Sequence, residues 1–355
     1  KHLMPEEPVL FDFKLFKKYG RVTDDSIRRS FKYIKKMRIC KNFKGDRPCK
    51  YYWTDKSHNC MDSNSSNYSE FSHRILLIKL DALGDVMRST ALVEGIKKKY
   101  PNSQLTWLVK DNAKFFVENN PSIDRVMIYN DENVRILQCE KFNILINLDK
   151  DAKSTSMAML FQSDVKRGYG LHKNGYPIPL NDASKYHYNI CLDNYGGKTK
   201  NKKSYQELIY EISEIDYHNE KPTLFLDENK YKNFRDKFFK DNNLNNKHKV
   251  IILNTGCGPV YPHKKWTYDG YKDLIKILSK EKNIKIVLTG SDAEISRNSK
   301  LYDECLSENL INTTDKYNLE EFCYLINLSN IVVTGDTVGL HIAISLTKNI
   351  ISFFG

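Results

Sequence analysis

The pattern of hydrophobic and polar positions changes sharply near residue 74. Residues 74–80 read Arg-Ile-Leu-Leu-Ile-Lys-Leu, a short and mostly apolar run, and the loop Asp81-Ala-Leu-Gly-Asp85 follows it. Residues 86–100 then carry apolar side chains at helical spacing and end near three consecutive lysines. An apolar run of this length, directly before a helix, predicts a strand that is buried on both faces of a parallel sheet.

Strands and helices continue to alternate in two blocks. In the first block we expect further strands at 104–109, 125–129 and 142–148, and helices at 115–119, 204–215 and 228–239. Residues 150–200 show no clear periodicity. In the second block we expect strands at 250–253, 284–288, 330–334 and 350–354, and helices at 268–280, 294–306, 319–327 and 337–346. The alternation predicts an α/β protein with two Rossmann-like domains that face a central cleft, joined by a polar hinge at 240–249.

The two ends of the sequence depart from this alternation. Residues 1–72 are basic and aromatic, with clustered cysteines, and predict a small helical and irregular extension. We therefore expect three parts: the extension at 1–72, a first domain at 73–243 and a second domain at 244–355. The sequence stops directly after a predicted strand, whereas folds of this kind usually continue into another helix, so we expect the second domain to be truncated.

Composition and charge narrow the classes of function. The chain has 355 residues, 40% of them hydrophobic, and a formal net charge of +12. No apolar run reaches the roughly 18 residues of a membrane-spanning helix, and residues 1–18 lack the apolar centre of a signal peptide. We therefore expect a cytoplasmic protein. The charge favours an anionic partner, namely a phosphorylated substrate, an anionic membrane surface or nucleic acid, and it equally fits a lysine-rich proteome.

Loops at predicted strand ends carry the candidate chemistry. Asp85 stands at the start of a helix, where a carboxylate either caps backbone amides or acts as a general base. The loop Asn254-Thr-Gly-Cys-Gly258, followed by Lys264 and Lys265, either brings amides and cations to phosphate oxygens or is an ordinary glycine turn. The segment Thr334-Gly-Asp-Thr-Val-Gly-Leu-His341 leads into a helix whose N-terminal amides favour an anion.

A fourth loop, Leu288-Thr-Gly-Ser-Asp-Ala-Glu294, offers Asp292 or Glu294 for ribose or sugar hydroxyls. Helix capping is an equal alternative for these two carboxylates.

Residues 75–100, 254–266 and 332–355 resemble the three signature regions of the glycosyltransferase family 9 heptosyltransferases. They occur in the expected order, each at a strand end, and the resemblance extends with gaps over about residues 74–355. It implies a GT-B fold and an inverting, metal-independent transfer of heptose. The donor would be ADP-heptose, and the acceptor a lipopolysaccharide core or another glycan, lipid-linked or protein acceptor.

The resemblance also implies roles for individual residues. Asp85 matches the family's proposed catalytic base. The donor-binding matches are Thr255, Gly256, Lys264, Glu294, Asp336, Thr337, Gly339 and His341. Val338 stands where the family usually has a glycine directly after Asp-Thr, which leaves the identity of the donor open.

The cysteines of the N-terminal extension form a separate candidate site. Cys40, Cys49 and Cys60, together with His58, have the side chains of a Cys₃His site for zinc or iron. Some family members carry a similar segment, often with a fourth cysteine close behind the third, and here Met61-Asp-Ser63 stands there. Uncoordinated thiols, or a disulfide, are the alternatives. A metal here would be structural or mediate assembly, and no cofactor is expected in catalysis.

Two other classes of function stay open. One is another nucleotide-sugar enzyme on the same scaffold, either a transferase with a different donor or an epimerase. The other is a non-catalytic basic binding or assembly protein. Scattered basic residues and the lack of an aromatic-and-basic motif argue against nucleic acid as the partner. A homo-oligomer, and peripheral contact with the inner face of the cytoplasmic membrane, remain open.

Overall fold

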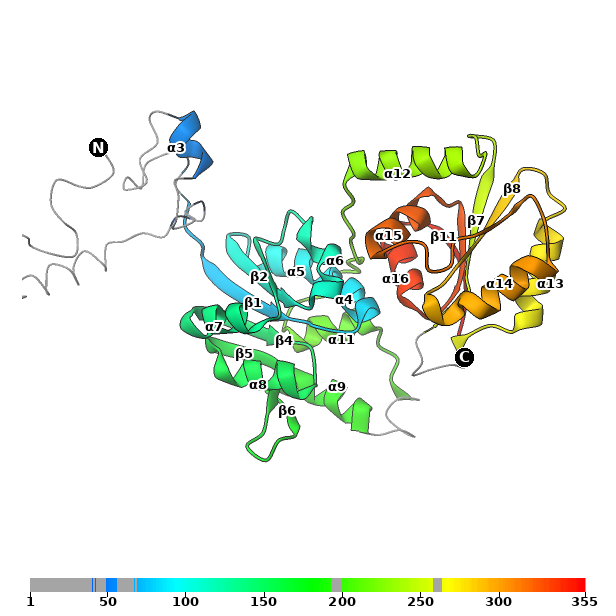
Figure 1. The fold of residues 1–355 in the computed structure, drawn as a ribbon. Helices are drawn as coiled ribbons and strands as arrows, with labels where there is room; N and C mark the ends of the chain where they lie inside the picture. Colours follow the sequence, from blue (N-terminus) through cyan, green and yellow to red (C-terminus); the bar gives the residue numbers. More distant parts are fainter. Residues whose placement is uncertain are drawn as a thin grey trace, which may run out of the picture. The chain divides into compact units, whose positions relative to one another are not determined.

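The computed structural model describes residues 40, 42, 49–55, 67, 69–192, 200–257 and 264–354. Contacts divide the chain into two compact units, residues 1–72 and residues 73–355. In the first unit, the described residues include helix α3 (Lys50–Thr54) and an isolated bridge between Cys40 and Glu70. Figure 1 traces the elements along the chain. Within the described residues, no helix is long and apolar enough to cross a membrane.

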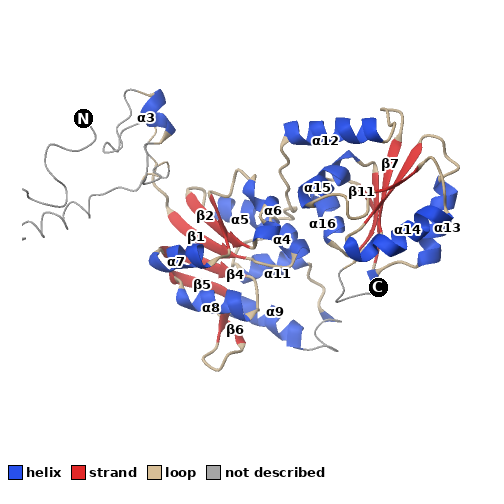
Figure 2. Cartoon of the chain, in the orientation of Figure 1, coloured by secondary structure: helices blue, strands red, loops and turns tan. Residues whose placement is uncertain are grey.

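The second unit contains two parallel sheets with helices packed beside them (Figure 2). The strands of the first sheet are β1 (His73–Ile78), β2 (Ser103–Val109), β3 (Arg125–Ile128), β4 (Lys141–Asn147), β5 (Gln162–Leu171) and β6 (Pro177–Pro179). Its helical segments are α4 (Leu83–Ser89), α5 (Ala91–Lys99), η1 (Asp111–Ala113), α6 (Phe115–Glu118), α7 (Asp131–Cys139), α8 (Ala152–Leu160), α9 (Asp182–Leu192) and α11 (Tyr205–Ile212).

The second sheet and its helices follow. The strands are β7 (Lys249–Asn254), β8 (Ile284–Thr289), β9 (Leu310–Asn312), β10 (Ile331–Gly335) and β11 (Asn349–Phe353). The helical segments are α12 (Glu228–Asp241), α13 (Tyr268–Leu278), η3 (Asp292–Glu294), α14 (Ile295–Glu304), α15 (Leu319–Leu328) and α16 (Val338–Ser345). The predicted pair of parallel-sheet units is confirmed.

Both sheets have the same strand order. The first runs β3-β2-β1-β4-β5-β6, with β6 antiparallel to β5, and the second runs β9-β8-β7-β10-β11. Counted within each sheet, the parallel strands follow the order 3-2-1-4-5. The winding direction reverses between strands 1 and 4, so each sheet has a crevice at the carboxyl ends of those strands. The two crevices lie between β1 and β4 and between β7 and β10.

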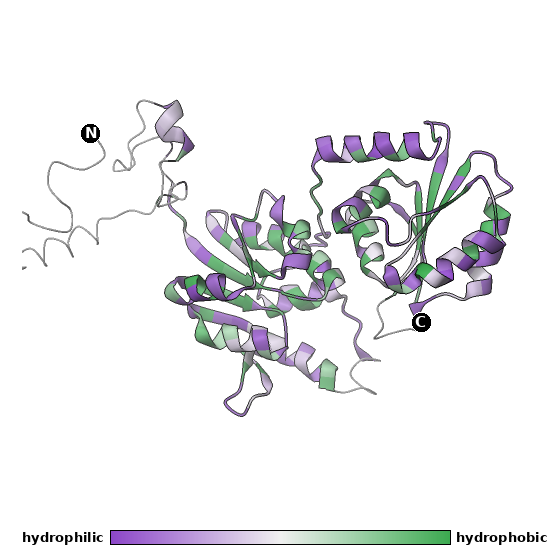
Figure 3. Cartoon of the chain, in the orientation of Figure 1, coloured by the Kyte–Doolittle hydropathy of each residue, from purple (hydrophilic) through white to green (hydrophobic). Residues whose placement is uncertain are grey.

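Strand β1 shows why the apolar run predicts a central strand. Ile75 and Leu77 pack in one hydrophobic cluster, and Leu76 and Ile78 pack in another. Alternate residues of a strand point to opposite faces, so both faces of β1 are buried. Figure 3 shows the central strands mostly in the hydrophobic colour, as expected for strands with two buried faces, whereas α12 is largely hydrophilic.

The structure differs from the expected elements in several places within the first half. Helix α7, between β3 and β4, is not among the expected helices. The predicted helix at 86–100 is two helices, α4 and α5, because the Thr90 hydroxyl donates to the Met87 carbonyl oxygen at 2.8 Å and competes with the helical pattern. The region 150–200, which lacks clear periodicity, contains α8, β5, β6 and α9. Helix α8 is rich in small and polar side chains, so its sequence shows no apolar stripe.

Helix α12 packs with the second sheet, although the predicted boundary at 243/244 assigns it to the first domain. Phe234 of α12 lies with its ring centroid 5.2 Å from that of Tyr317 and 5.8 Å from that of Tyr324. Lys230 pairs with Glu320 on α15 at 3.1 Å. The chain therefore reaches the second sheet before α12, and not at the polar segment 240–249. The division of the chain into domains remains a prediction.

Candidate functional site

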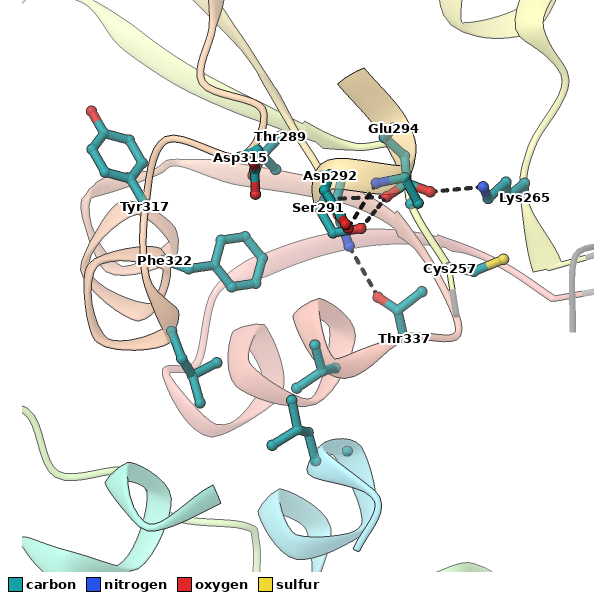
Figure 4. Close-up of a pocket in the computed structure, with 18 of the residues that line it drawn as sticks. Cys257, Lys265, Thr289, Ser291, Asp292, Glu294, Asp315, Tyr317, Phe322 and Thr337 are labelled. Carbon is teal, nitrogen blue, oxygen red and sulfur yellow. Dashed lines mark hydrogen bonds and ion pairs between the residues drawn. The ribbon is translucent and has the colours of Figure 1, made fainter. Parts of the chain in front are cut away.

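A cleft of about 870 Å³ lies where strand-end loops of the second sheet meet the loop after β1. The loop after β1 contributes Ala82, Leu83 and Gly84. The remaining lining residues follow β7, β8, β9 and β10. Figure 4 shows how Phe322, Asp292, Glu294 and Thr337 surround this hollow. Carboxyl ends of parallel strands are where α/β folds bind ligands, so this cleft is the candidate site.

Two neighbouring lysines carry positive charge to the cleft, and each is paired with an acid. The Lys264 ammonium lies 2.6 Å from Asp336 Oδ2, and the Lys265 ammonium lies 2.7 Å from Glu294 Oε1. All four residues line the cleft. Both side chains of the Lys264–Asp336 pair are partly exposed, and such a pair contributes little net stability, so Lys264 can exchange Asp336 for another anion at small cost. Glu294 is buried, so Lys265 keeps a fixed partner.

Glu294 combines the two roles that its sequence position leaves open. Its carboxylate accepts hydrogen bonds from the Ser291 amide at 3.1 Å and the Ser291 hydroxyl at 2.8 Å, which completes a capping box. It also lines the cleft and pairs with Lys265. A β-carbon at Gly256 would lie 2.6 Å from Glu294 Oε2, so a larger residue there would force this carboxylate to move.

The N-terminus of α16 lies at the cleft without a side-chain cap. Thr337 is the N-cap residue but makes no capping hydrogen bond to the helix. Its hydroxyl instead accepts from Asn254 Nδ2 at 3.0 Å, and the same amide donates to Thr334 Oγ1 at 2.9 Å. Gly339 allows this contact, because a β-carbon there would lie 2.7 Å from Asn254 Nδ2. The amides at this helix start, with the helix dipole, favour an anion.

His341 lies one turn into α16 and packs against the first half of the unit. A β-carbon at Gly84 would lie 2.8 Å from His341 Cδ2. His341 Nε2 lies 3.7 Å from Asp336 Oδ1. Burial lowers the pKa of His341 to about 4, so the imidazole is neutral near pH 7. It therefore acts there as a hydrogen-bonding and packing group, not as a cation.

Asp85 is the third residue of α4, directly after the cleft residue Gly84. The helix-capping alternative is not observed, because the N-cap residue is Ala82. Asp85 Oδ1 instead accepts a hydrogen bond from Arg88, and its Oδ2 lies 3.8 Å from the Lys79 ammonium. Burial raises the pKa of Asp85, but Lys79 and Arg88 outweigh it and lower the pKa below its ordinary value. The carboxylate is therefore ionised at neutral pH.

Lys79 and Asp149 are residues that the sequence analysis did not select. Lys79 is 4% exposed and donates to Asp149 across the crevice between β1 and β4. One sequence signal existed: Lys79 is the charged residue inside an apolar strand run, and Asp149 follows another strand. A charge in a strand buried on both faces needs a partner, but the sequence does not say which one.

The predicted donor-binding residues fall into two groups. Gly256, Lys264, Glu294, Asp336 and Thr337 line the cleft. Thr255, Gly339 and His341 lie beneath its surface as buried residues. Thr255, for example, donates from its hydroxyl to Asn298 Oδ1 at 2.7 Å. The structure thus brings all eight to one side of the cleft, and what each contributes to binding remains a prediction.

The sequence analysis also missed the apolar end of the cleft. Tyr317, Leu319 and Phe322 line it beside Thr313 and Asp315. Their spacing around the start of α15 looks like an ordinary core pattern, so periodicity alone gives them no special role. A flat aromatic surface beside polar groups is suited to a planar ring such as a nucleobase.

The cysteines of the N-terminal extension gain no support as a metal site. In the part of the chain that the structure describes, no group of three His, Cys, Asp or Glu side chains is placed to hold an ion. Cys40 and Cys49 are buried. His58 and Cys60 lie outside the described residues. The zinc or iron site stays a hypothesis.

Comparisons with known proteins agree with this geometry. The family model for glycosyltransferase family 9 (heptosyltransferase) matches residues 133–355. Lipopolysaccharide heptosyltransferase 1 of Campylobacter coli is 23% identical over 311 residues, which cover 79% of this chain and 84% of that protein.

Two solved structures show the same fold. The glycosyl transferase family 9 protein of Veillonella parvula has a TM-score of 0.66 at 18% identity, covering 80% of this chain and 82% of that chain. Escherichia coli heptosyltransferase WaaC, solved with ADP-2-deoxy-2-fluoro heptose, has a TM-score of 0.54 at 16% identity, covering 79% and 88%. The predicted GT-B fold is confirmed. With its family model matched over residues 133–355, this chain belongs to glycosyltransferase family 9 and is a glycosyltransferase.

Proposed function

We propose that this glycosyltransferase moves a heptose from ADP-heptose to an acceptor hydroxyl of the lipopolysaccharide core or a related glycan. The observation that carries the proposal is a single cleft with two kinds of lining. Its second-sheet side presents Lys264, Lys265 and the start of α16, and its first-sheet side ends at Gly84, next to Asp85. Groups that can bind a diphosphate therefore lie at the same site as a carboxylate that can accept a proton.

In this proposal the donor lies against the second sheet. Its diphosphate takes the place of Asp336 as the partner of Lys264 and lies beside Lys265, which keeps its pair with the buried Glu294. Its base lies at the apolar end near Tyr317 and Phe322. The released Asp336 carboxylate is then available to a sugar hydroxyl. The relatives support this arrangement, since WaaC was solved with an ADP-heptose analogue and shares the fold.

The transfer is a single displacement. Asp85 takes the proton of the acceptor hydroxyl as that oxygen forms a bond to the anomeric carbon. The bond from the anomeric carbon to the diphosphate oxygen breaks on the opposite face, and its electron pair leaves with the diphosphate. Lys264, Lys265 and the α16 amides stabilise that charge in place of a metal ion. The anomeric configuration is inverted.

The net charge of +12 extends the proposal to the location of the acceptor. Positive surface charge attracts a protein to anionic lipids, so we propose peripheral contact with the membrane that carries a lipid-linked acceptor. Sedimentation with vesicles tests this: binding to vesicles with anionic lipids, lost at high salt, is expected, and equal binding to neutral phosphatidylcholine vesicles contradicts it.

The test of the proposed function is a donor and product profile. Calorimetric titration with ADP, UDP and GDP, in the presence of a metal chelator, should give selective binding of ADP that Lys264→Met weakens. Incubation with ADP-heptose and a heptose-deficient lipopolysaccharide core should add the mass of one heptose. Preference for a uridine or guanosine donor would identify a different transferase, and loss of transfer in chelator would overturn metal independence.

A further inference from the structure

Lys79 has two acidic neighbours and is fully engaged with one of them. Its side chain is 5% exposed, and its ammonium donates to Asp149 Oδ1 and to the backbone oxygen of Asp81. Asp85 Oδ2 lies 3.8 Å from the same nitrogen. A buried ammonium needs compensating partners. Asp149 and Asp81 meet that need, and the ammonium still faces Asp85.

Asp149 is itself held by the strand ends around it. Its Oδ2 accepts the Leu80 amide at 2.5 Å. The Asn147 side chain accepts the Asp149 amide at 3.1 Å and donates to the Asp149 backbone oxygen at 3.0 Å. The Trp107 indole donates to the Lys79 backbone oxygen at 3.2 Å. Both members of the pair are therefore positioned by rigid strands before any ligand binds, as is typical of groups that orient a reacting residue.

We propose that Lys79 and Asp149 are positioning residues for the transfer step: Asp149 anchors the Lys79 ammonium, which holds the Asp85 carboxylate in place and ionised. The inference rests on Asp85 being the base of the proposed function. Lys79 and Asp149 act through Asp85 and touch neither the donor nor the acceptor.

Besides Lys79, charged and titratable groups on α4 itself and on three other elements face Asp85. They are Arg88 on α4, His187 on α9, Tyr205 on α11 and His341 on α16. Burial lowers the pKa of both histidines to about 4 and raises the pKa of Tyr205, so these three are uncharged near pH 7. Arg88 pairs with Asp85 Oδ1 and stacks on the Tyr205 ring, with 3.9 Å between guanidinium carbon and ring centroid. Lys79 and Arg88 thus supply the positive charge around Asp85.

The anchoring role predicts opposite effects for two variants. Asp149→Asn leaves Lys79 with Asp85 as its remaining acidic side chain, so the Asp85 carboxylate becomes a weaker base. The double variant Lys79→Met with Asp149→Asn removes the pair together and leaves no unpaired charge behind. Asp85 then loses its Lys79 neighbour and is protonated at a higher pH.

The experiment is a pH series of kcat and acceptor KM between about pH 3 and 8, because the pKa of Asp85 lies below its ordinary value. It is run for each variant with Asp85 present and with Asp85→Asn. We expect Asp149→Asn to lower kcat severalfold with little change in KM. In the double variant, the acid limb of the kcat profile should rise by about one pH unit, because a neighbouring charge shifts a carboxylate by about that much. The single variant Lys79→Arg keeps the positive charge, so its kcat profile should have the acid limb of the wild type. In the Asp85→Asn background, neither change should lower the residual rate further.

The chain offers a matched control pair. Lys97 lies 2.5 Å from Asp124 Oδ2, and that oxygen accepts the Leu105 amide at 2.8 Å, so the pair has the same kinds of contact as Lys79–Asp149 at a more exposed place. It lies at the amino end of β2, opposite the cleft edge of the sheet. Lys97→Met with Asp124→Asn should leave the pH profile unchanged.

The inference is overturned if the double variant keeps the wild-type acid limb, or if its loss of activity adds fully to that of Asp85→Asn. Either result, with the thermal midpoint retained, would show a purely structural pair. Failure of the proposed function looks different: wild-type protein does not transfer heptose, or Asp85→Asn alone keeps normal turnover.

Discussion

The two halves of the α/β unit share a strand order but close their crevices with different chemistry. Between β1 and β4, the buried ion pair Lys79–Asp149 spans the crevice. Between β7 and β10, the Asn254 amide spans it through hydrogen bonds to Thr334 and Thr337. The first closure is charged and the second is neutral.

This difference decides where positive charge is available. In the first half, the ammonium of Lys79 is buried behind Asp85 and cannot be separated from its partners without a large cost. In the second half, Lys264 and Lys265 are 27% and 30% exposed on the cleft surface. The partner of Lys264, Asp336, is also partly exposed, and such a pair can exchange partners at small cost. One half is therefore arranged to keep a carboxylate ionised, and the other to offer cations to an anion.

The largest expected effect comes from the carboxylate of the first half. Asp85→Asn should lower the transfer rate by about a thousandfold, because a positioned general base contributes roughly 10²–10⁴-fold. ADP binding, measured by calorimetry, should stay within experimental error, since the groups proposed to bind the diphosphate lie in the other half. Asp131→Asn, at the exposed start of α7, is the matched control. Near-normal turnover of the Asp85 variant would show that the first half does not supply the general base.

The next effect comes from a cation of the second half. Lys264→Met should weaken ADP binding by about tenfold or more, since a charge-assisted bond to phosphate is worth roughly 1.5–3 kcal/mol. Lys285→Met removes a lysine that contacts the Glu308 backbone oxygen away from the cleft and should bind ADP normally. Equal affinities of the two variants would contradict the assignment.

A smaller effect is expected where the halves touch. Gly84→Ala places a methyl group 2.8 Å from His341 Cδ2, and overpacking of this kind costs about 1–3 kcal/mol. The methyl group should push α4 away from α16 and lower kcat severalfold while ADP affinity is kept. Unchanged kcat and thermal midpoint would show that α4 and α16 accommodate the added methyl group without loss of stability.

The smallest effect concerns pH, and here the halves should behave alike. Burial lowers the pKa of His187 in the first half and of His341 in the second to about 4, whereas an unfolded histidine has a pKa near 6.5. Between these values the unfolded state binds more protons. The free energy of unfolding should therefore fall as pH drops from about 6.5 to 4, by up to about 1.4 kcal/mol per pH unit for each histidine.

Chemical unfolding at pH 7.5 and 5.5 measures this loss. His187→Gln and His341→Gln should each lose less stability than the wild type over that interval. A replacement that leaves the pH dependence unchanged would show that its histidine has the same pKa in the folded and unfolded states.

Much of the fold follows from local patterns. The central strands β1, β7, β8 and β10 are apolar on both faces. An apolar run of this kind is recognised in the sequence without knowledge of the neighbouring strands. By contrast, α8 and β5 escape sequence analysis because their side chains do not follow one period. The position of α12 also depends on a distant contact, the packing of Phe234 on Tyr317 and Tyr324.

The candidate site divides in the same way. Asp85, Lys264, Asp336 and Thr337 are found from the sequence because each follows a predicted strand, and strand ends of one parallel sheet share an edge. Lys79 and Asp149 are 70 residues apart, and Phe322 has the spacing of a core residue. Their neighbours are set by strand order and helix packing, which no local pattern encodes.

By itself, the sequence determined the central strands and many of the helices beside them, which loops follow those strands, and which of those loops carry charge. These are properties of neighbouring residues and of their periodicity. The tertiary structure decided which charges meet: that Lys79 belongs with Asp149 and Asp85, Lys264 with Asp336, and Lys265 with Glu294. The reason is physical, because an ion pair depends on distance and burial, and both arise only when the strands take their order in the sheet.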